Sequence, residues 1–188
     1  MPRHVVLVGL PGSGKSTVGK LAADALGAPL FDIDQLIVRQ MGRPVAQLFG
    51  MLGEAAFREM ERDAVAAAGA GEPAVIVPGG GWAAQPGQLE AARPSSIVVY
   101  LRCAAEAAAR RLDQGEVRPL LVGADPVQRM RALLEAREPW YRLADYEVDA
   151  GPRPAEAVAG EVVALARRHA GWPGSPGETG PGHQHKSL

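Results

Sequence analysis

A glycine-rich run near the N-terminus constrains the fold more than any other part of the chain. Residues 9–17 read GLPGSGKST and follow the apolar residues 5–8. The run matches G-x-x-x-x-G-K-S at every fixed position, and apolar residues at helical spacing begin directly after it. Strand, glycine-rich loop and helix in this order are typical of a P-loop, in which backbone N–H groups and a helix N-terminus surround nucleotide phosphates. The alternative is a glycine-rich turn that carries a surface lysine.

Two side chains of this loop carry phosphate chemistry. Lys15 is expected to reach the β- and γ-phosphates, and the Ser16 hydroxyl is expected to bind Mg²⁺. The loop residues predicted to bind the nucleotide are Gly12, Ser13, Gly14, Lys15, Ser16 and Thr17.

Length, charge and cysteine content limit what the chain can be. Its 188 residues suit one domain with a substantial core, and the net charge of −1 gives no electrostatic reason to expect nucleic acid. No apolar run approaches the roughly 20 residues that span a bilayer, and the first strand begins too early for a signal peptide. Cys103 is the only cysteine, which excludes an intrachain disulfide. We expect a cytoplasmic protein with neither a membrane nor a nucleic-acid partner.

Short apolar runs alternate with longer helical patterns, which predicts a parallel sheet covered by helices. The predicted strands are residues 5–8, 30–33, 74–77, 96–101 and 146–148. The predicted helices are roughly residues 18–26, 35–41, 45–52, 53–70, 104–112, 125–144 and 154–170. Residues 171–188 are rich in Gly and Pro, so we expect a disordered tail after one domain of residues 1–170.

Two aspartates end the second predicted strand. Alternation along a strand would place Asp32 and Asp34 on one side of the sheet, at the carboxyl end where α/β sheets bind ligands. One carboxylate could serve Mg²⁺ and the other could accept a proton from a hydroxyl nucleophile. The alternative is a pair of helix-capping aspartates.

Two further clusters indicate a second ligand beside the nucleotide. Glu54 and Arg58 are spaced i, i+4, which alone is typical of an exposed salt bridge. Three glycines at residues 79–81 directly follow a predicted strand, and glycine lets a ligand approach the backbone closely.

The last two clusters add arginines. Arg118 lies in a segment bounded by Gly115 and Gly123 whose weak helical signal suits a mobile lid that excludes water and brings a cation to the phosphates. The alternative is a charged surface loop. Arg137 precedes Glu138-Pro139, and we expect a helix break there that turns Arg137 inward to bind a carboxylate.

Taken in this order, the clusters resemble the shikimate kinase family, small P-loop kinases that phosphorylate the 3-hydroxyl of shikimate with ATP and Mg²⁺. The resemblance covers about residues 4–169. It rests on residues 9–17, Asp32-Ile33-Asp34, Gly53-Glu54 with Phe57-Arg58 and Glu61, Gly79-Gly80-Gly81, Arg118-Pro119-Leu120-Leu121, and Arg137 followed by Tyr141.

The resemblance implies a three-layer α/β fold and the layout of its site. The expected sheet has five parallel strands in the order 2-3-1-4-5, with an acceptor-binding region at about residues 33–62 and a lid at about residues 114–124. It further implies a monomer that binds ATP, Mg²⁺ and shikimate, a small-molecule substrate.

The resemblance also assigns roles to single residues. The implied catalytic residues are Lys15, Asp34 and Arg118, and the implied Mg²⁺ ligands are Ser16 and Asp32. The residues implied to bind the nucleotide besides the P-loop are Arg111, Arg118, Arg153 and Pro154, with Arg111 and the Arg153-Pro154 pair on either side of the adenine. The residues implied to bind the acceptor are Asp34, Phe57, Arg58, Gly79, Gly80, Gly81, Arg118 and Arg137, with Phe49 packed beside the pocket.

Some features depart from the family pattern or leave other functions open. Trp82 follows the glycines where the family has a small or aliphatic residue, which leaves the shape of the acceptor pocket open. One alternative function is a kinase for gluconate or a nucleoside monophosphate. Another is a noncatalytic protein that binds a nucleotide as a switch or scaffold.

Overall fold

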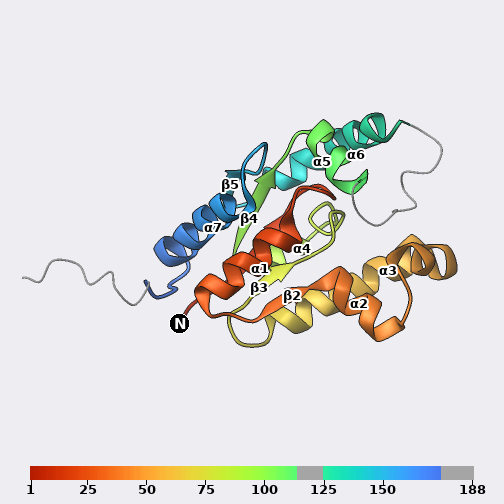
Figure 1. The fold of residues 1–188 in the computed structure, drawn as a ribbon. Helices are drawn as coiled ribbons and strands as arrows, with labels where there is room; N and C mark the ends of the chain where they lie inside the picture. The colour runs from red at the N-terminus through yellow and green to blue at the C-terminus, as the bar shows by residue number, and fades with distance from the viewer. Residues whose placement is uncertain (114–124, 175–188) are drawn as a thin grey trace, which may run out of the picture.

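The computed structural model of the chain describes residues 1–113 and 125–174, in which strands and helices alternate (Figure 1). The strands are β1 (His4–Val8), β2 (Leu30–Asp32), β3 (Val75–Val77), β4 (Ser96–Arg102) and β5 (Tyr146–Asp149). The helices are α1 (Lys15–Leu26), α2 (Ile33–Met41), α3 (Val45–Gly69), α4 (Gln88–Ala92), α5 (Ala105–Asp113), α6 (Pro126–Tyr141) and α7 (Ala155–His169). The short helix α4 was not predicted from the sequence.

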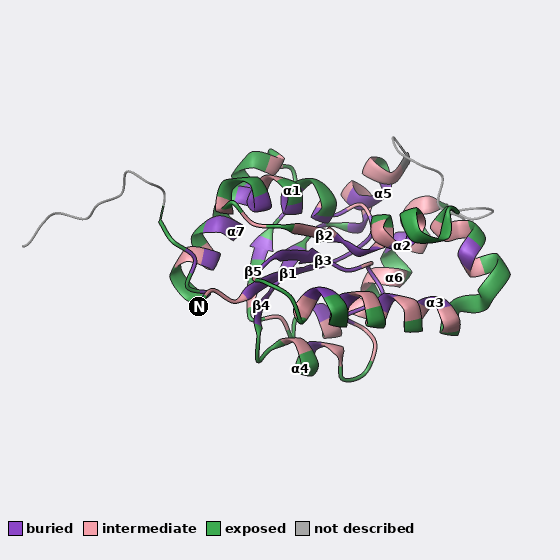
Figure 2. Ribbon diagram, turned by 90° about the horizontal axis from the view of Figure 1, so that it is seen from below, coloured by how far each residue is buried: buried purple, intermediate pink, exposed green. Residues whose placement is uncertain are grey.

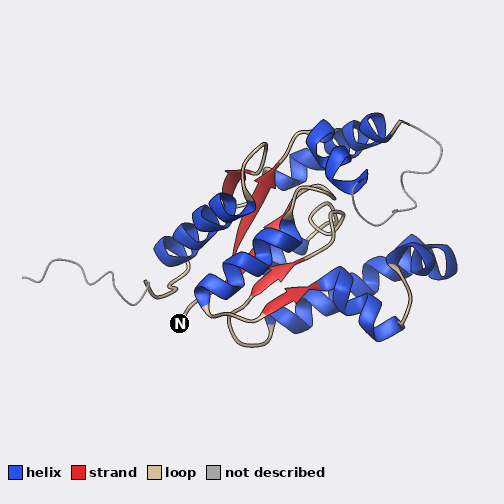
Figure 3. Ribbon diagram, viewed as in Figure 1, coloured by secondary structure: helices blue, strands red, loops and turns tan. Residues whose placement is uncertain are grey.

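The strands form one parallel sheet in the order β2-β3-β1-β4-β5, which confirms the predicted topology. Val5 of β1 lies opposite Val75 of β3 on one side and Ile97 of β4 on the other. Figure 3 shows the strand arrowheads pointing to one side of the molecule. The segments that follow β1, β2 and β3 therefore meet at this carboxyl edge, where open α/β sheets bind ligands.

Helices cover both faces of the sheet, which makes three layers. Val5 and Leu7 point to the face that α1 and α7 cover, whereas Val6 and Val8 point to the opposite face. Alternate residues of a strand point to opposite faces, and here both faces are apolar because both are buried. Figure 2 shows the buried strands between these two helical layers.

The second strand is shorter than predicted, and this changes the location of Asp34. β2 ends at Asp32, whose side chain accepts a hydrogen bond from the backbone N–H of Gln35 at 3.2 Å. This N-cap begins α2 at Ile33, so Asp34 lies in the first helical turn. The prediction that strand alternation aligns Asp32 with Asp34 was wrong, because the capping interaction ends the strand first.

The sequence predicts a break in the region of α3 and another in α6, and the structure has only the first. α3 contains Gly53 with φ of 81°, outside helical values, which separates the two helices predicted there. α6, by contrast, continues through Pro139 to Tyr141, so the predicted break after Arg137 was wrong. Proline removes one backbone N–H, and the helix resumes at once because the Arg142 N–H donates to the Glu138 carbonyl at 2.9 Å.

The folded part of the chain extends past residue 170. Trp172 is 9% exposed, and its indole N–H donates to the carbonyl of Arg3 at 2.9 Å. Residues 171–174 therefore belong to the described fold, because the Trp172 indole packs against the core. The predicted lid at residues 114–124 and the tail from residue 175 onward lie outside the described residues. In the part that the structure describes, no helix has the length and apolarity to cross a bilayer.

Candidate active site

The P-loop connects β1 to α1 at the carboxyl edge of the sheet. Gly12 has φ of 79°, and a Cβ at this position would collide with the carbonyl oxygen of Ala108 on α5. Only glycine meets both conditions. Lys15 is 8% exposed, and its Nζ donates to the carbonyls of Gly9 at 2.9 Å and Leu10 at 2.8 Å. The loop thus holds an ammonium group beside the start of a helix, and Ser16 and Thr17 are exposed there.

Ser16 and Asp32, the predicted Mg²⁺ ligands, carry oxygen atoms of the type that Mg²⁺ prefers. The Asp32 carboxylate is 6% exposed, and both of its oxygens accept hydrogen bonds only from Gln35, at 3.2 and 3.4 Å, among the contacts within the described residues. Those residues hold no group of three or more acidic, histidine or cysteine side chains that could bind a metal ion. The donor set fits an ion held by one or two protein oxygens together with nucleotide phosphates, the usual arrangement for Mg²⁺.

Each glycine of the loop after β3 lies against a different part of the site. A Cβ on Gly79 would collide with Oε1 of Glu61 and lie 2.9 Å from Oδ1 of Asp34. A Cβ on Gly80 would lie 2.7 Å from Cδ of Pro11 in the P-loop, and one on Gly81 would collide with the Arg58 guanidinium. None of the three has a φ in the left-handed region. The glycines are therefore explained by close approach, which brings Asp34, the P-loop and Arg58 together.

Helix α3 presents Arg58 between two carboxylates. Nη1 of Arg58 donates to Oε2 of Glu61 at 2.8 Å, and Nη2 lies 3.4 Å from Oε1 of Glu54. The Glu61 side chain is fully buried, whereas Glu54 is 69% exposed, so only the first pair is shielded from water. Burial raises the pKa of Glu61, and the Arg58 guanidinium opposes that rise. The ring centroids of Phe49 and Phe57 are 4.4 Å apart, and the Arg58 guanidinium lies over both rings.

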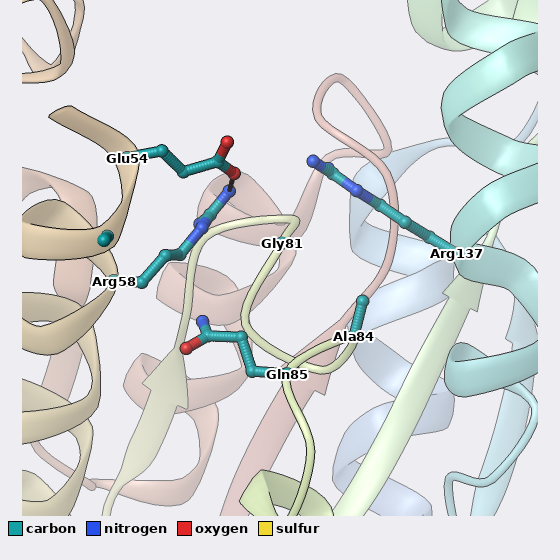
Figure 4. Close-up of a pocket in the computed structure, with 7 residues that line it drawn as sticks. Glu54, Arg58, Gly81, Ala84, Gln85 and Arg137 are labelled. Carbon is teal, nitrogen blue, oxygen red and sulfur yellow. Dashed lines mark hydrogen bonds and ion pairs between the residues drawn. The ribbon is translucent and has the colours of Figure 1, made fainter.

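Two arginines face each other across a cavity of about 510 Å³. The lining residues are Glu54, Ala55, Arg58, Gly81, Ala84, Gln85 and Arg137. Figure 4 shows Arg58 reaching in from α3 and Arg137 from α6, on the other side of the loop that carries Gly81. Arg137 thus reaches the site from an unbroken helix. The pair suits a planar anion, because guanidinium groups can bind a carboxylate with two parallel hydrogen bonds.

Tyr141 joins α6 to the glycine loop. It is fully buried, and its hydroxyl donates to the carbonyl of Gly80 at 2.5 Å. Burial raises the pKa of Tyr141 to about 12, so the hydroxyl keeps its proton at neutral pH. This hydrogen bond fixes the distance between the helix that carries Arg137 and the loop that carries Gly81.

A second cavity of about 200 Å³ lies beside the P-loop. Its lining includes Ser13, Gly14, Thr17, Arg111 and Arg153. The Arg111 guanidinium donates to the carbonyls of Ser13 at 3.2 Å, Ala150 at 3.1 Å and Gly151 at 2.7 Å. Arg111 therefore connects the P-loop to the segment after β5, beside this cavity.

Eight of the predicted site residues line these two cavities, and the others that the structure describes do not. The eight are Arg58, Gly81 and Arg137 at the first cavity and Ser13, Gly14, Thr17, Arg111 and Arg153 at the second. Phe57 is 1% exposed and supports Arg58 from below, and Pro154 is exposed at the start of α7. Asp34 and Gly79 lie against each other, because a Cβ on Gly79 would be 2.9 Å from Oδ1 of Asp34. Neither residue lines the first cavity. Arg118 lies outside the described residues.

Three residues were given no role in the sequence-based site. Glu61 lies three residues after Arg58 on the buried face of α3, a spacing that could have indicated a partner. Tyr141 follows Arg137 by one helical turn, and Gln85 has no signal in the sequence. Trp82, whose effect on the pocket was open, is 1% exposed and packs into the core instead of lining the cavity.

Comparison with known proteins now identifies the family. A family model described as shikimate kinase matches residues 11–167 of the chain. The chain belongs to the shikimate kinase family. A shikimate kinase of Mycobacterium tuberculosis is 43% identical over 164 residues, which cover 87% of this chain and 93% of that protein. A shikimate kinase of Caldanaerobacter subterraneus subsp. tengcongensis is 38% identical over 86% of this chain and 94% of its own length.

Solved structures of the family have the same fold. The shikimate kinase from Acinetobacter baumannii in complex with shikimate superposes with a TM-score of 0.84, at 32% identity, over 89% of this chain and 94% of that one. A gluconokinase from Sinorhizobium meliloti reaches a TM-score of 0.56 at 23% identity, which shows a shared fold alone.

Proposed function

We propose that this shikimate kinase family member transfers the γ-phosphoryl group of ATP to the 3-hydroxyl of shikimate, giving shikimate 3-phosphate. The observation that carries the proposal is the pair Arg58 and Arg137, which face each other across a cavity next to the P-loop. A carboxylate held by these two groups would place the ring of the acceptor over Gly81. Its hydroxyls would then point toward Asp34 and the P-loop.

In the proposed reaction the protein contributes position and charge, with little covalent chemistry. Lys15 leaves the carbonyls of Gly9 and Leu10 and binds the β- and γ-phosphates, while the backbone N–H groups at the start of α1 bind phosphate oxygens. Positive charge at these atoms stabilises the charge that spreads over the transferred phosphoryl group.

Asp34 is the proposed base. Its carboxylate lies against Gly79, one residue from the glycine that contacts Pro11 of the P-loop, so it is close to both substrates. It would orient the acceptor hydroxyl and accept its proton as the new P–O bond forms. The hydroxyl oxygen attacks the γ-phosphorus, the bond to the bridging oxygen of ADP breaks, and the proton ends on the carboxylate.

Ser16 and Asp32 would hold Mg²⁺, which when bound neutralises charge on the β- and γ-phosphates. Arg111 and Arg153 would lie on either side of the nucleotide base, which their shared cavity supports. Arg118 stays the predicted lid cation. A cytoplasmic location and a monomeric state also stay predictions.

Acceptor-dependent release of ADP tests the proposal. Purified protein with ATP and Mg²⁺ is given shikimate, gluconate or a nucleoside monophosphate, and ADP is measured in a coupled assay. We expect turnover with shikimate at least 100-fold above the rate without acceptor, on the order of what a well-positioned nucleophile gains. If the protein prefers gluconate or a nucleoside monophosphate, that compound is the acceptor instead of shikimate. If no acceptor increases the release of ADP, the result favours a noncatalytic nucleotide-binding protein.

A further inference from the structure

Gln85 lies beside the acceptor cavity and contacts the carboxylate that holds Arg58. Its side-chain Nε2 donates to Oε2 of Glu61 at 3.1 Å, the same oxygen that accepts from Nη1 of Arg58. Figure 4 shows Gln85 on the loop after β3, below the Arg58 guanidinium. One carboxylate oxygen therefore joins a residue of α3 to a residue of this loop.

The loop aims Gln85 at Glu61 through a short series of turns. The N–H of Trp82 donates to the carbonyl of Gly79 at 3.1 Å, and the N–H of Gln85 donates to the carbonyl of Trp82 at 3.0 Å. The buried Trp82 side chain anchors the middle of this series in the core. The position of the Gln85 amide is thus set by packing as well as by its own hydrogen bond.

Only one end of the Gln85 amide has a partner within the described residues. Its Oε1 is buried and has no hydrogen-bond partner in the described part of the chain, and an unpaired buried oxygen is unfavourable. Reversing the amide would point Oε1 at the Glu61 carboxylate, which when charged has no proton to donate and would repel that oxygen. An apolar side chain of the same length would avoid the unpaired oxygen, so the amide N–H group is the part of Gln85 that needs an explanation.

We infer that Gln85 is a positioning residue for acceptor binding, which acts by holding Oε2 of Glu61 and so fixing the Arg58 guanidinium over Gly81. With Oε2 shared, Arg58 contacts Glu61 through one nitrogen only. Its Nη2 faces the exposed Glu54 at 3.4 Å, a weak pairing that an acceptor carboxylate can replace. The inference rests on the proposed function, because it takes the cavity to be the acceptor site.

Gln85→Met tests the inference, since it keeps the length of the side chain and removes the amide. We expect the KM for shikimate to rise about ten-fold, as for loss of a hydrogen bond to a charged group, with the KM for ATP unchanged and kcat within about three-fold. The melting temperature does not distinguish the two roles, because the variant loses both the unpaired oxygen and the hydrogen bond to the buried Glu61 carboxylate. A purely structural role predicts unchanged KM values, and this result would overturn the inference.

The control is Gln128→Met, which makes the same substitution at an exposed position of α6. It should leave both KM values unchanged. Glu61→Gln provides a double-mutant cycle, because Gln85→Met should add less than about two-fold in that background if Gln85 acts through the carboxylate. Independent, multiplying effects of the two substitutions would also overturn the inference.

Gln85→Glu adds a test by pH. The groups that face Glu61 are Arg58 on its own helix, Asp34 on α2 and Tyr141 on α6. A protonated carboxyl group in place of the amide can still donate to Glu61, whereas two charged carboxylates repel. The KM for shikimate of this variant should therefore rise with increasing pH between about 5 and 8, relative to the unchanged protein measured alongside. A constant ratio across that range would contradict the inference.

Turnover of the unchanged protein shows whether a negative result contradicts the proposed function or only the role of Gln85. If the unchanged protein shows no shikimate-dependent turnover, the proposed function fails. If it does and the Gln85 variants keep its KM values, the function holds and only the positioning role fails.

Discussion

Arg58 illustrates how single side chains determine this site. Its guanidinium lies over Gly81, contacts buried Glu61 on one side and exposed Glu54 on the other, and has Phe49 at 5.5 Å below. A charge so surrounded has few orientations open to it. In the proposed function this fixed cation would save the ordering cost that a free arginine adds to binding of an acceptor.

Asp34→Asn tests the proposed base. The substitution keeps the size of the side chain and removes the charge and the proton acceptor, so we expect kcat to fall on the order of 10²-fold or more. The KM for ATP should change little. Asp63→Asn, at an exposed position of α3, is the matched control and should leave kcat unchanged. If Asp34→Asn keeps kcat within a few-fold of wild type, Asp34 only positions the acceptor.

Arg137→Lys tests the two-arginine clamp. Lysine keeps the charge and loses the planar pair of donors, so we expect the KM for shikimate to rise about ten-fold or more while the KM for ATP is unchanged. Arg131→Lys, an exposed arginine of α6 that pairs with Glu106, should leave both values as they are. Equal increases for both substrates would place Arg137 outside the acceptor site.

At the scale of elements, the loop after β3 does the most to assemble the site. Its three glycines lie against residues from α2, α3 and the P-loop, and the Gly80 carbonyl accepts the Tyr141 hydroxyl from α6. The bend of α3 at Gly53 precedes the turn that carries Glu54 and Arg58, so both carboxylates and the guanidinium lie on the straight second half of that helix.

Gly81→Ala tests this close approach. The backbone of Gly81 suits alanine, but the new Cβ would lie 2.5 Å from Cζ of Arg58 and displace the guanidinium. We expect kcat/KM for shikimate to fall by about 10- to 100-fold, the usual effect of misplacing a positioning group. Gly160→Ala on α7 is the control, because nothing lies near its Cβ, and it should raise stability by about 1 kcal/mol. If Gly81→Ala keeps the kcat/KM of the unchanged protein, Arg58 can move without loss of activity.

At the scale of the whole molecule, the two ends of the described chain are tied together. Arg3 donates its N–H to the carbonyl of Ala170 at 2.8 Å, and the Arg3 carbonyl accepts from the Trp172 indole at 2.9 Å. Trp172 packs in the same apolar cluster as β1, β4 and α7. The connection lies at the amino edge of the sheet, away from the proposed site.

Trp172→Ala should therefore reduce stability and spare catalysis. Loss of a mostly buried indole near a chain end should lower the free energy of unfolding by about 2–3 kcal/mol, measured by urea denaturation. Trp172→Phe keeps an aromatic ring and loses the N–H, so it should cost about 1 kcal/mol. The KM values at 25 °C should match wild type in both variants. A change in KM would show that the two ends are coupled to the site.

Local patterns were sufficient to predict much of this protein. The P-loop with Lys15, the parallel sheet and the glycine loop at residues 79–81 follow from short motifs, because each motif meets a local requirement of strand, turn or helix. The strand order and the place of Arg58 in the site came from the family resemblance. The family and its fold, given by resemblance to those motifs, were confirmed by comparison. The roles of the site residues stay predictions.

Only the tertiary structure decided the contacts between distant segments. Two local outcomes also came only from the structure: Asp34 lies in a helix because the Asp32 side chain caps α2, and α6 continues through Pro139. The fold brought Gln85 to Glu61, 24 residues away, and placed Trp82 in the core. Such pairs depend on how helices pack over the sheet, and packing joins side chains whose separation in the chain carries no pattern.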